Sequence, residues 1–588
     1  MIDTVKKKIN FPLPFKRKTF RPRSKKIIAY DLETTNIMVG TPTPLYVTAF
    51  GHDGEFKIAE RTDSLEALLE ILLTNFLITK NDGVRFVGWN ANNFDSYLVA
   101  KALLLDNRFE MRPYMTRSKS LRGMRVVNTV TGGEWEFLDG MAMTGCMMTL
   151  EKFLNAFAPD YEKLKNIIDF DAGESFDYRN QAHCNYAMRD SEGLFWGMMR
   201  AQKIVKETFN MVLQPTIGNM GIKIFQAHIP PDVKVQTLNE ESEQILRDYV
   251  MRGGYCYCVR RFTGKVWKYD INQAYAAAMR EAWLPDGHAN KVRSYWPRYP
   301  GIYHLTATHK INKIPFYYRD TGGDSVFGQR EISATWLTSI EVEQLMVEGW
   351  KINIIEGYLF SGRFKMHEYV DKLEYTRMNA EGGTNGAKGL MIKAIGNNSY
   401  GKTVEKLDGV EYIISAECPE GYLPFVKGDL GIDLPIWVKK NEPTKKDYHK
   451  PQIGAFITAH VRMVVRRAAL LCPDGWLYAD TDCVVYDREP KGLDIHATRY
   501  GAWKIECEGV EYRIITKKVY AKVDNTEKHA KGMNVKKLTA KDFELWSQGK
   551  PPTQNQLHKN NLMKVLGGAE MFIERVRRGT KISLDKNN

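Results

Sequence analysis

Two acidic residues interrupt a run of apolar and β-forming residues in Trp476-Leu477-Tyr478-Ala479-Asp480-Thr481-Asp482-Cys483-Val484-Val485-Tyr486. Val, Tyr and Trp favour strands, so this stretch predicts a hairpin with Asp480 and Asp482 at its tip. Carboxylates at an apolar turn are costly to desolvate unless a cation lies beside them. The stretch therefore predicts an antiparallel sheet that ends in a cation-binding turn.

Earlier in the chain, another predicted strand also ends in an acidic residue. Residues 266–269 are apolar or aromatic apart from one lysine, and they lead directly into Asp270. Between the two acidic stretches, Lys393, Asn397 and Tyr400 are spaced to lie on one face of a helix. A cation and a flat ring on one helix face suit a triphosphate and a base.

A third group of acids lies nearer the N-terminus. Asp31 and Glu33 follow an apolar run and project from the same face of the expected strand. Asp95 follows another apolar strand, and Tyr186 and Asp190 lie one helical turn apart. Four carboxylates can hold two Mg²⁺ ions about 4 Å apart for attack on a phosphodiester, with the phenol orienting the water.

Length and composition exclude several classes of protein. The chain has 588 residues, of which 43% are hydrophobic and 26% charged, as expected for several globular domains and not for a disordered, collagen-like or coiled-coil protein. No run of 18 apolar residues occurs, so we expect no membrane span. Its eight cysteines contain no paired CxxC motif, which predicts reduced thiols and neither a disulfide framework nor a zinc site.

The net charge of +14 is concentrated at the two ends of the chain. Residues 1–26 contain ten Lys or Arg and one Asp, and residues 526–588 contain 13 basic and six acidic residues. Basic segments on a nearly neutral body indicate binding to a polyanion, because Lys and Arg gain affinity when they release counterions from phosphates. Three roles are open for residues 1–26: binding DNA, binding a priming protein, or forming a solvated arm. The N-terminus has no apolar signal core, so secretion is not expected.

The acidic stretches resemble known motifs in their order. The earlier stretches resemble the three motifs of proofreading 3′-5′ exonucleases: Asp31-x-Glu33, Asn90-x3-Phe94-Asp95 and Tyr186-x3-Asp190. Lys165-Asn166-Ile167-Ile168 resembles the lysine element that the protein-primed subgroup of these enzymes carries.

The later stretches resemble motifs A, B and C of family B DNA polymerases, at 270–275, 393–401 and 478–483. Lys518-Val519-Tyr520 resembles the element of that family that holds the primer terminus. In motif A, Gln273, Ala274 and Ala276 depart from the family pattern; in motifs B and C, Asn398 and Cys483 do so. None of these departures removes a metal ligand.

The resemblance implies α/β and α+β domains, with an RNase H-like exonuclease followed by a right-hand polymerase with insertions. The implied divisions are a basic segment 1–26, an exonuclease 27–205, palm 206–280, an insertion resembling the first terminal-protein region 281–362, fingers 363–402, an insertion resembling the second terminal-protein region 403–450, palm 451–525 and a basic thumb 526–588. In the subgroup, the second region encircles the template and gives processivity.

The resemblance also implies the role of each site residue. Metal ligands would be Asp270, the Ile271 carbonyl, Asp482, Asp31, Glu33, Asp95 and Asp190. Other catalytic residues would be Asp480, Tyr186 and Lys165. Nucleotide contacts would be Tyr275, Arg377, Lys393, Asn397 and Tyr400, with Tyr275 excluding a 2′-OH. Contacts to the primer or DNA would be Lys518, Tyr520, Asn90 and Phe94.

The implied activity is DNA synthesis on a linear phage or plasmid genome, primed by a terminal protein and corrected by the exonuclease. It implies two Mg²⁺ ions in each site, replaceable by Mn²⁺, with primer-template DNA, a single-stranded 3′ end and dNTPs as ligands. A monomer in the cytoplasm of a host cell is expected, and a single-stranded DNA-binding protein is a further candidate partner. The alternatives are an RNA-primed or primer-independent family B polymerase, a nuclease, and a DNA-binding protein with an inactive polymerase half.

Overall fold

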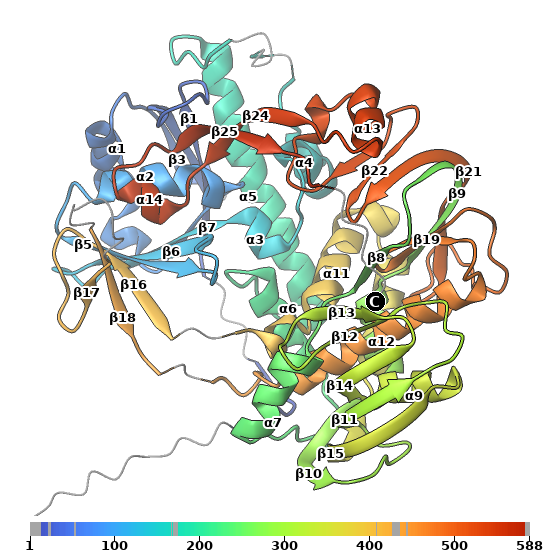
Figure 1. Cartoon of the computed structure of the whole chain (residues 1–588). Coiled ribbons are helices and arrows are strands. Elements are labelled where there is room, and N and C mark those ends of the chain that lie inside the picture. Colours follow the sequence, from blue (N-terminus) through green and yellow to red (C-terminus); the bar gives the residue numbers. More distant parts are fainter. Residues whose placement is uncertain are drawn as a thin grey trace, which may run out of the picture.

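The computed structural model describes residues 13–20, 25–51, 54–165, 167–168, 174–406, 409–425, 435–442 and 445–581. Figure 1 shows the early strands β1 to β7 on one side of the molecule and the later sheets on the other, with the long helix α5 between them. The expected combination of α/β and α+β domains is confirmed.

The N-terminal sheet has ten strands in the order β17-β18-β16-β5-β6-β7-β4-β1-β2-β3. Seven of them come from the first part of the chain: β1 (Ile27–Thr34), β2 (Pro44–Gly51), β3 (Phe56–Arg61), β4 (Arg85–Gly88), β5 (Phe109–Met115), β6 (Leu121–Asn128) and β7 (Glu134–Asp139). β1 runs parallel to β4 and antiparallel to β2. Residues 27–30 are all buried, as expected for a central strand covered on both faces.

Helices cover this sheet. They are α1 (Leu65–Ile71), α2 (Asp95–Leu103), α3 (Gly140–Thr144), α4 (Leu150–Phe157) and α5 (Gln181–Phe209). α5 is held on the sheet by a buried hydrogen bond of 2.7 Å between the hydroxyls of Thr48 and Ser191. The predicted strands before Asp31 and Asp95 are therefore confirmed as β1 and β4, and the helix that carries Tyr186 and Asp190 is α5.

The central sheet has seven strands in the order β23-β22-β21-β9-β20-β19-β8. Its strands are β8 (Tyr255–Cys258), β9 (Phe262–Ile271), β19 (Trp476–Thr481), β20 (Cys483–Tyr486), β21 (Trp503–Thr516), β22 (Val519–Lys522) and β23 (Lys528–Ala530). The predicted hairpin is formed by β19 and β20, and β9 pairs with β20. Because β9, β20 and β19 are neighbours in this order, Asp270, Asp480 and Asp482 lie at the same end of adjacent strands.

Helices pack beside the central sheet and connect it to the N-terminal domain. They are α6 (Ile217–Ala227), α7 (Glu240–Ile245), α8 (Ala274–Glu281), α10 (His367–Met378), α11 (Ala387–Asn398) and α12 (Pro451–Leu471). Of the three residues expected on one helix at motif B, Lys393 and Asn397 lie on α11, whereas Tyr400 lies beyond its end at Asn398. In the part of the chain that the structure describes, no helix has the length and apolar character needed to cross a membrane.

The segment between α8 and α10 forms the small α/β unit that its sequence predicts. Four strands pair in the order β10 (Leu284–Val292), β15 (Lys351–Phe364), β11 (Gly301–Thr308) and β14 (Glu331–Thr338), with α9 (Ser339–Val347) beside them. A separate hairpin is formed by β12 (Phe316–Arg319) and β13 (Ser325–Gly328).

The segment between α11 and α12 forms what we call the insertion hairpin: β16 (Val410–Ile414), β17 (Leu423–Pro424) and β18 (Ile436–Lys440). The sequence did not predict how this hairpin is attached. Ile414 pairs with Met111 of β5, so the hairpin extends the N-terminal sheet.

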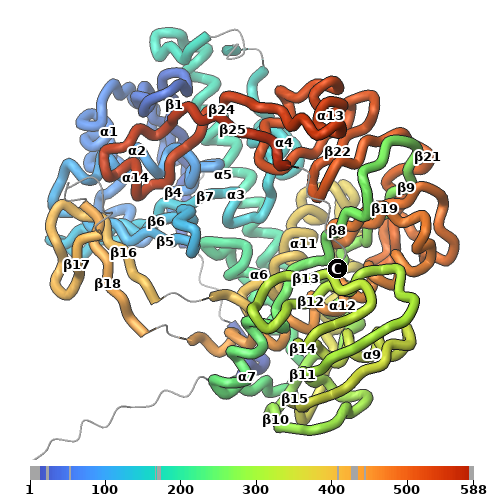
Figure 2. The backbone as a smooth tube through the Cα atoms, in the orientation of Figure 1, coloured from blue at the N-terminus to red at the C-terminus, as the bar shows by residue number. Residues whose placement is uncertain are grey.

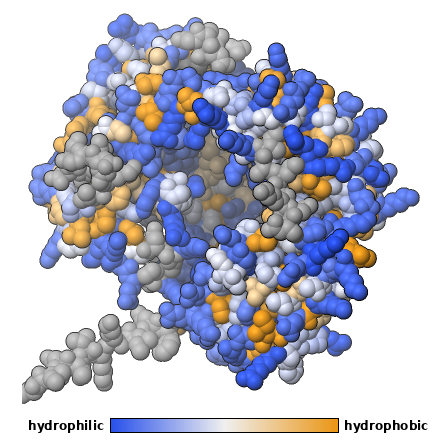
Figure 3. Space-filling model, in the orientation of Figure 1, coloured by the Kyte–Doolittle hydropathy of each residue, from blue (hydrophilic) through white to orange (hydrophobic). Residues whose placement is uncertain are grey.

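The C-terminal region returns to the N-terminal domain. It consists of α13 (Ala540–Ser547), β24 (Thr553–Lys559), α14 (Leu562–Leu566) and β25 (Phe572–Arg578). Gly40 and Phe572 exchange two backbone hydrogen bonds of 2.9 Å. Lys559 donates to the Asn93 side chain at 3.0 Å and to the Tyr97 hydroxyl at 3.1 Å. The C-terminal hairpin and the insertion hairpin thus connect the two sides of the molecule, whose face is hollowed at its centre (Figure 3).

Candidate active sites

The first site lies at the turn between β19 and β20. Asp482 occupies this turn, and its backbone oxygen accepts a hydrogen bond of 2.9 Å from the Ile271 N–H at the end of β9. Thr481 adopts a left-handed conformation, with φ of 65°, which lets the chain reverse within one residue. Asp270 pairs with Cys483 across the two strands. The sheet therefore brings Asp270 and Asp482 to one edge, as the sequence predicts.

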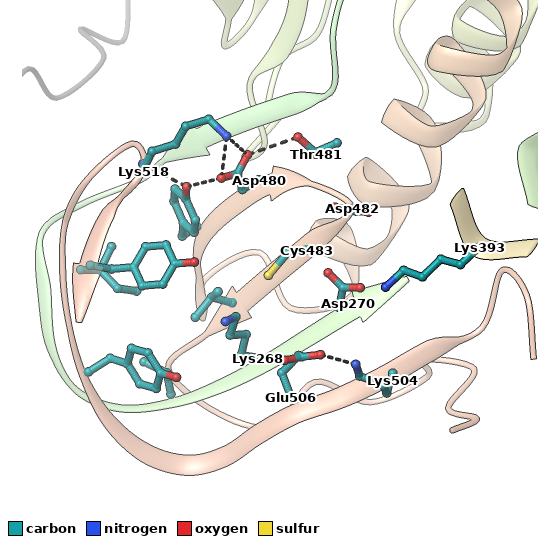
Figure 4. A pocket seen from close by; sticks show the side chains of 16 residues that line it. Lys268, Asp270, Lys393, Asp480, Thr481, Asp482, Cys483, Lys504, Glu506 and Lys518 are labelled. Atoms are coloured by element: carbon teal, nitrogen blue, oxygen red, sulfur yellow. Dashed lines mark hydrogen bonds and ion pairs between the residues drawn. The ribbon is translucent and has the colours of Figure 1, made fainter. Parts of the chain in front are cut away.

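These two acids line a cavity of about 550 Å³. Lys393 points into the same cavity from α11, and Figure 4 shows it facing Asp270. Burial, together with the negative charges of Asp482 and Glu506, raises the pKa of Asp270 to about 7. Burial and Asp480 also raise the pKa of Asp482. Two neighbouring carboxylates with raised pKa values are suited to bind a cation.

Asp480 differs from its two neighbours because it already has a cationic partner. Its carboxylate accepts hydrogen bonds of 2.7 and 2.9 Å from the Lys518 ammonium and one of 3.0 Å from the Tyr478 hydroxyl. Tyr520, two residues beyond Lys518, lines the same cavity. The structure therefore brings both residues of the Lys-x-Tyr element to the acidic turn (Figure 4).

Of the residues expected to contact a nucleotide, Lys393 lines the cavity at this turn, and the others lie on α8, α10 and the end of α11. Lys393 and Asn397 are exposed on one face of α11. Tyr275, in α8, stacks on Tyr400 with ring centres 5.3 Å apart. Arg377, in α10, has a buried Nε atom without a hydrogen-bond partner among the described residues. The arrangement offers cations and flat rings beside the two carboxylates.

The second site lies where β1, α2 and α5 meet. β1 carries Asp31 and Glu33, α2 begins at Asp95, and Asp190 is buried on α5. The Asp95 carboxylate accepts a hydrogen bond of 3.2 Å from the Leu32 N–H, which ties α2 to β1. The structure therefore brings together all four acids that the sequence predicts.

Burial dominates the electrostatics of this second site. Together with the charge of Asp190, it raises the pKa of Asp31 to about 7. Burial, followed by the charge of Asp31, raises the pKa of Glu33 and of Asp95 well above their usual values. These groups also suit a bound cation, although no set of three or more His, Cys, Asp or Glu side chains in the described ranges is already arranged around one ion position.

The lysine of this site is Lys163, and not Lys165 as the sequence predicted. Lys163 forms a short ion pair with Asp190, and its ammonium lies 4.5 Å from the ring centre of Tyr186. Burial would lower its pKa, but Asp190 and Tyr186 raise it, so the lysine stays charged. Lys165 is largely exposed and pairs with Glu151 at 3.3 Å. The sequence favours Lys165 because a hydrophobic residue, Ile168, follows it three positions later, whereas Asn166 stands at that position after Lys163.

We expect Lys163→Ala to reduce degradation of a 3′ end by about 10²-fold, because a fixed positive charge beside the reacting phosphate is removed. Lys165→Ala is the matched control and should stay close to wild type. Degradation rates on 5′-labelled single-stranded DNA measure both variants. Equal losses in the two variants would contradict this assignment.

Asn90 and Phe94 lie at the entrance of α2. Asn90 has a left-handed backbone, with φ of 61°, and its side chain accepts a hydrogen bond of 2.7 Å from Asn93. The ring of Phe94 lies 6.3 Å from that of Phe572 in β25. The C-terminal hairpin therefore borders the second site, which the sequence did not predict.

The sequence matches the family described as DNA polymerase type B, organellar and viral, over residues 152–423. A DNA polymerase of Kluyveromyces lactis is 28% identical over 233 residues, which are 36% of this chain and 23% of that one. The DNA-directed DNA polymerase of Enterobacteria phage PRD1 is 27% identical over 325 residues, 52% of this chain and 54% of that one. The chain thus spans about a quarter to a half of the length of these relatives.

The fold is that of phi29 DNA polymerase. One structure of that protein matches with a TM-score of 0.71 at 17% identity, covering 95% of this chain and all of the other. A complex of phi29 DNA polymerase with primer-template DNA and incoming nucleotide matches with a TM-score of 0.70. The fold is therefore the expected one, with an RNase H-like N-terminal domain followed by a right-hand arrangement of domains. In sequence over residues 152–423 and in fold, the chain is similar to the type B DNA polymerases of organelles and viruses.

Proposed function

We propose that this protein is a template-directed DNA polymerase with a 3′-5′ proofreading exonuclease, acting at two separate carboxylate sites. The observation that carries the proposal is that the pairing of β9 with β20 brings Asp270 and Asp482 into one cavity, which Lys393 also lines. Templated synthesis is tested by offering each dNTP singly on four templates that differ in one base. Only the complementary nucleotide should be added.

Asp270 and Asp482, with the Ile271 carbonyl, would hold two Mg²⁺ ions, and Mn²⁺ would substitute. The chemistry that the bound ions supply is activation of the primer 3′-OH and neutralisation of the pyrophosphate leaving group. Lys393 and Arg377 are proposed to bind the triphosphate as fixed cations. Lys518 and Tyr520 would hold the primer terminus, and Asp480 would fix the position of Lys518 through their ion pair.

The Mg²⁺ requirement should depend on pH. The raised pKa of Asp270, about 7, means that a proton competes with the cation below that value. The Mg²⁺ concentration for half-maximal extension should be constant above pH 8 and rise by up to about tenfold per unit below pH 7. Titrations of Mg²⁺ at pH 6 and pH 8 measure this. The same requirement at both would contradict the role of Asp270.

Tyr275 is proposed to lie under the incoming sugar and exclude a 2′-OH. Its ring is held in place by stacking on Tyr400. Tyr275→Ala should raise the incorporation of ribonucleotides relative to deoxynucleotides by roughly 10- to 200-fold, as expected for a steric contact of 1–3 kcal/mol. Single-nucleotide insertion with UTP and dTTP measures the ratio, and an unchanged ratio would contradict the assignment. Tyr299→Ala, an exposed tyrosine on another surface, is the control.

In the second site, Asp31, Glu33, Asp95 and Asp190 would hold two further Mg²⁺ ions. Tyr186 and Lys163 would orient the attacking water and the scissile phosphate. Asn90 and Phe94 are proposed to contact the single-stranded 3′ end, because they border the acids beside Phe572.

We further propose that synthesis starts from a terminal protein. Support comes from the two inserted units, the α/β unit with α9 and the insertion hairpin, which lie where the protein-primed subgroup has its terminal-protein regions. RNA priming and initiation without a primer are the alternatives. Incubation with labelled dNTP and proteins from the native host should label a protein covalently if the proposal holds, and RNA or DNA alone if it does not.

A further inference from the structure

Part of the basic N-terminal segment is built into the fold. Phe15 is fully buried and stacks on Phe225 of α6, with ring centres 6.0 Å apart. Its backbone exchanges hydrogen bonds of 2.9 and 3.0 Å with Val235. Residues 13–20, which we call the N-terminal strap, are therefore anchored to the fold by Phe15, whose ring belongs to the packed core. Figure 2 shows this first part of the chain, in dark blue, beside α7.

The strap also binds the chain that returns from the insertion hairpin to α12. Lys18 forms an ion pair of 2.6 Å with Asp447, whose side chain is largely buried. Gln226 donates to both Asp447 and the backbone oxygen of Lys16, at 2.7 and 3.1 Å. Lys450 is buried and donates to the Leu13 carbonyl at 3.2 Å. The returning leg, residues 445–450, is thus fixed by the strap.

The strap contacts reach the outgoing leg of the hairpin as well. His449 of the returning leg lies 3.5 Å from Glu405, which in turn pairs with Lys402 at 2.5 Å. At its other end, the hairpin buries Ile414 and Ile436 in the core of the N-terminal domain. The hairpin is therefore held at both ends, by the N-terminal sheet and by the strap.

A cavity of about 1030 Å³ lies beside the outgoing leg. Arg117, Arg122, Lys402 and Lys406 line it, together with Asn398 at the end of α11. This mostly basic lining, which also contains Glu405, suits the phosphates of a single strand. The outgoing leg forms one wall of the cavity through Lys402, Glu405 and Lys406. A leg that is held less firmly would therefore hold a bound strand less firmly.

We propose that the N-terminal strap positions the insertion hairpin and thereby sets how many nucleotides the protein adds before it releases DNA. This inference rests on the proposed polymerase function. Lys18, Asp447 and Phe15 are positioning residues in this account and take no part in the chemistry. Loosening the strap should increase DNA release while the insertion step at either carboxylate site stays unchanged.

The test is a primer-extension assay in which a heparin trap allows one binding event for each polymerase molecule. Lys18→Glu should shorten the products several-fold, because it places two carboxylates together. The single-turnover insertion rate and the degradation of single-stranded DNA should stay at wild-type values. The swap Lys18→Glu with Asp447→Lys should restore the product length, which mere misfolding would not allow. Phe15→Ala should shorten the products by removing the buried ring.

The matched control is Lys16→Glu with Arg17→Glu. Both side chains are exposed, and neither has an ion pair with a described residue. This variant should keep the product length. Wild-type product length in Lys18→Glu would overturn the proposal, as would an equal loss in the control, which would make the segment a basic arm that binds DNA. Absence of any extension by the wild-type protein would instead refute the polymerase function itself.

Discussion

Asp482→Ala is expected to reduce primer extension by about 10³-fold or more and to leave 3′-5′ degradation intact. The substitution removes one of the two buried carboxylates proposed to hold Mg²⁺ at the edge of the central sheet. Loss of metal-based stabilisation of several kcal/mol corresponds to a rate loss of this size, since each 1.36 kcal/mol is about tenfold. Extension and degradation of one 5′-labelled primer, with and without dNTPs, measure both activities.

The matched control for Asp482→Ala is Asp494→Ala. Asp494 lies on the same part of the chain, is exposed and pairs with Arg499 at 2.6 Å, away from the acidic turn. It should extend primers normally. The degradation that Asp482→Ala retains shows in the same experiment that the variant is folded. Normal extension by Asp482→Ala would contradict the assignment of the turn between β19 and β20.

Asp31→Ala should produce the opposite result. Asp31 is buried at the centre of the second cluster, and its charge is the main electrostatic influence on both Glu33 and Asp95. We expect degradation to fall by about 10³-fold or more, for the same reason as at the first site, with extension close to wild type. The assay is degradation of a 5′-labelled single strand in Mg²⁺ without dNTPs.

The control for Asp31→Ala is Asp63→Ala. Asp63 is an exposed acid of the same domain, paired only with Arg61. It should degrade DNA at the wild-type rate. If Asp31→Ala lost extension as well as degradation, the two carboxylate clusters would not be separate sites, or the substitution would have unfolded the domain. Circular dichroism and the melting temperature distinguish these outcomes.

The acids of both sites were predictable because local sequence determines their placement. Asp270, Asp480 and Asp482 follow strands whose residues predict the strands themselves, and the pairing of β9 with β20 then brings the acids together. Tyr186 and Asp190 share a helix face for the same local reason.

Other features depend on contacts between residues far apart in the sequence. No local pattern indicates that Ile414 joins the sheet through Met111, since a single pair makes the connection. The buried contacts of Glu341 with Arg252 and with Arg462 likewise join three distant segments. Lys163 was missed because Lys165 and not Lys163 has a hydrophobic residue three positions later, and only the position of Asp190 in the fold identifies Lys163.

The presence of separate synthesis and degradation sites in this protein is tested most directly with a primer whose 3′ nucleotide is mismatched to the template. With Mg²⁺ and all four dNTPs, the wild-type protein should remove the mismatch and then extend the corrected primer to full length. Asp31→Ala should retain the mismatch in every extended product, and Asp482→Ala should only shorten the primer. A wild-type protein that shortens the primer and never extends it would contradict the account and make the chain a nuclease.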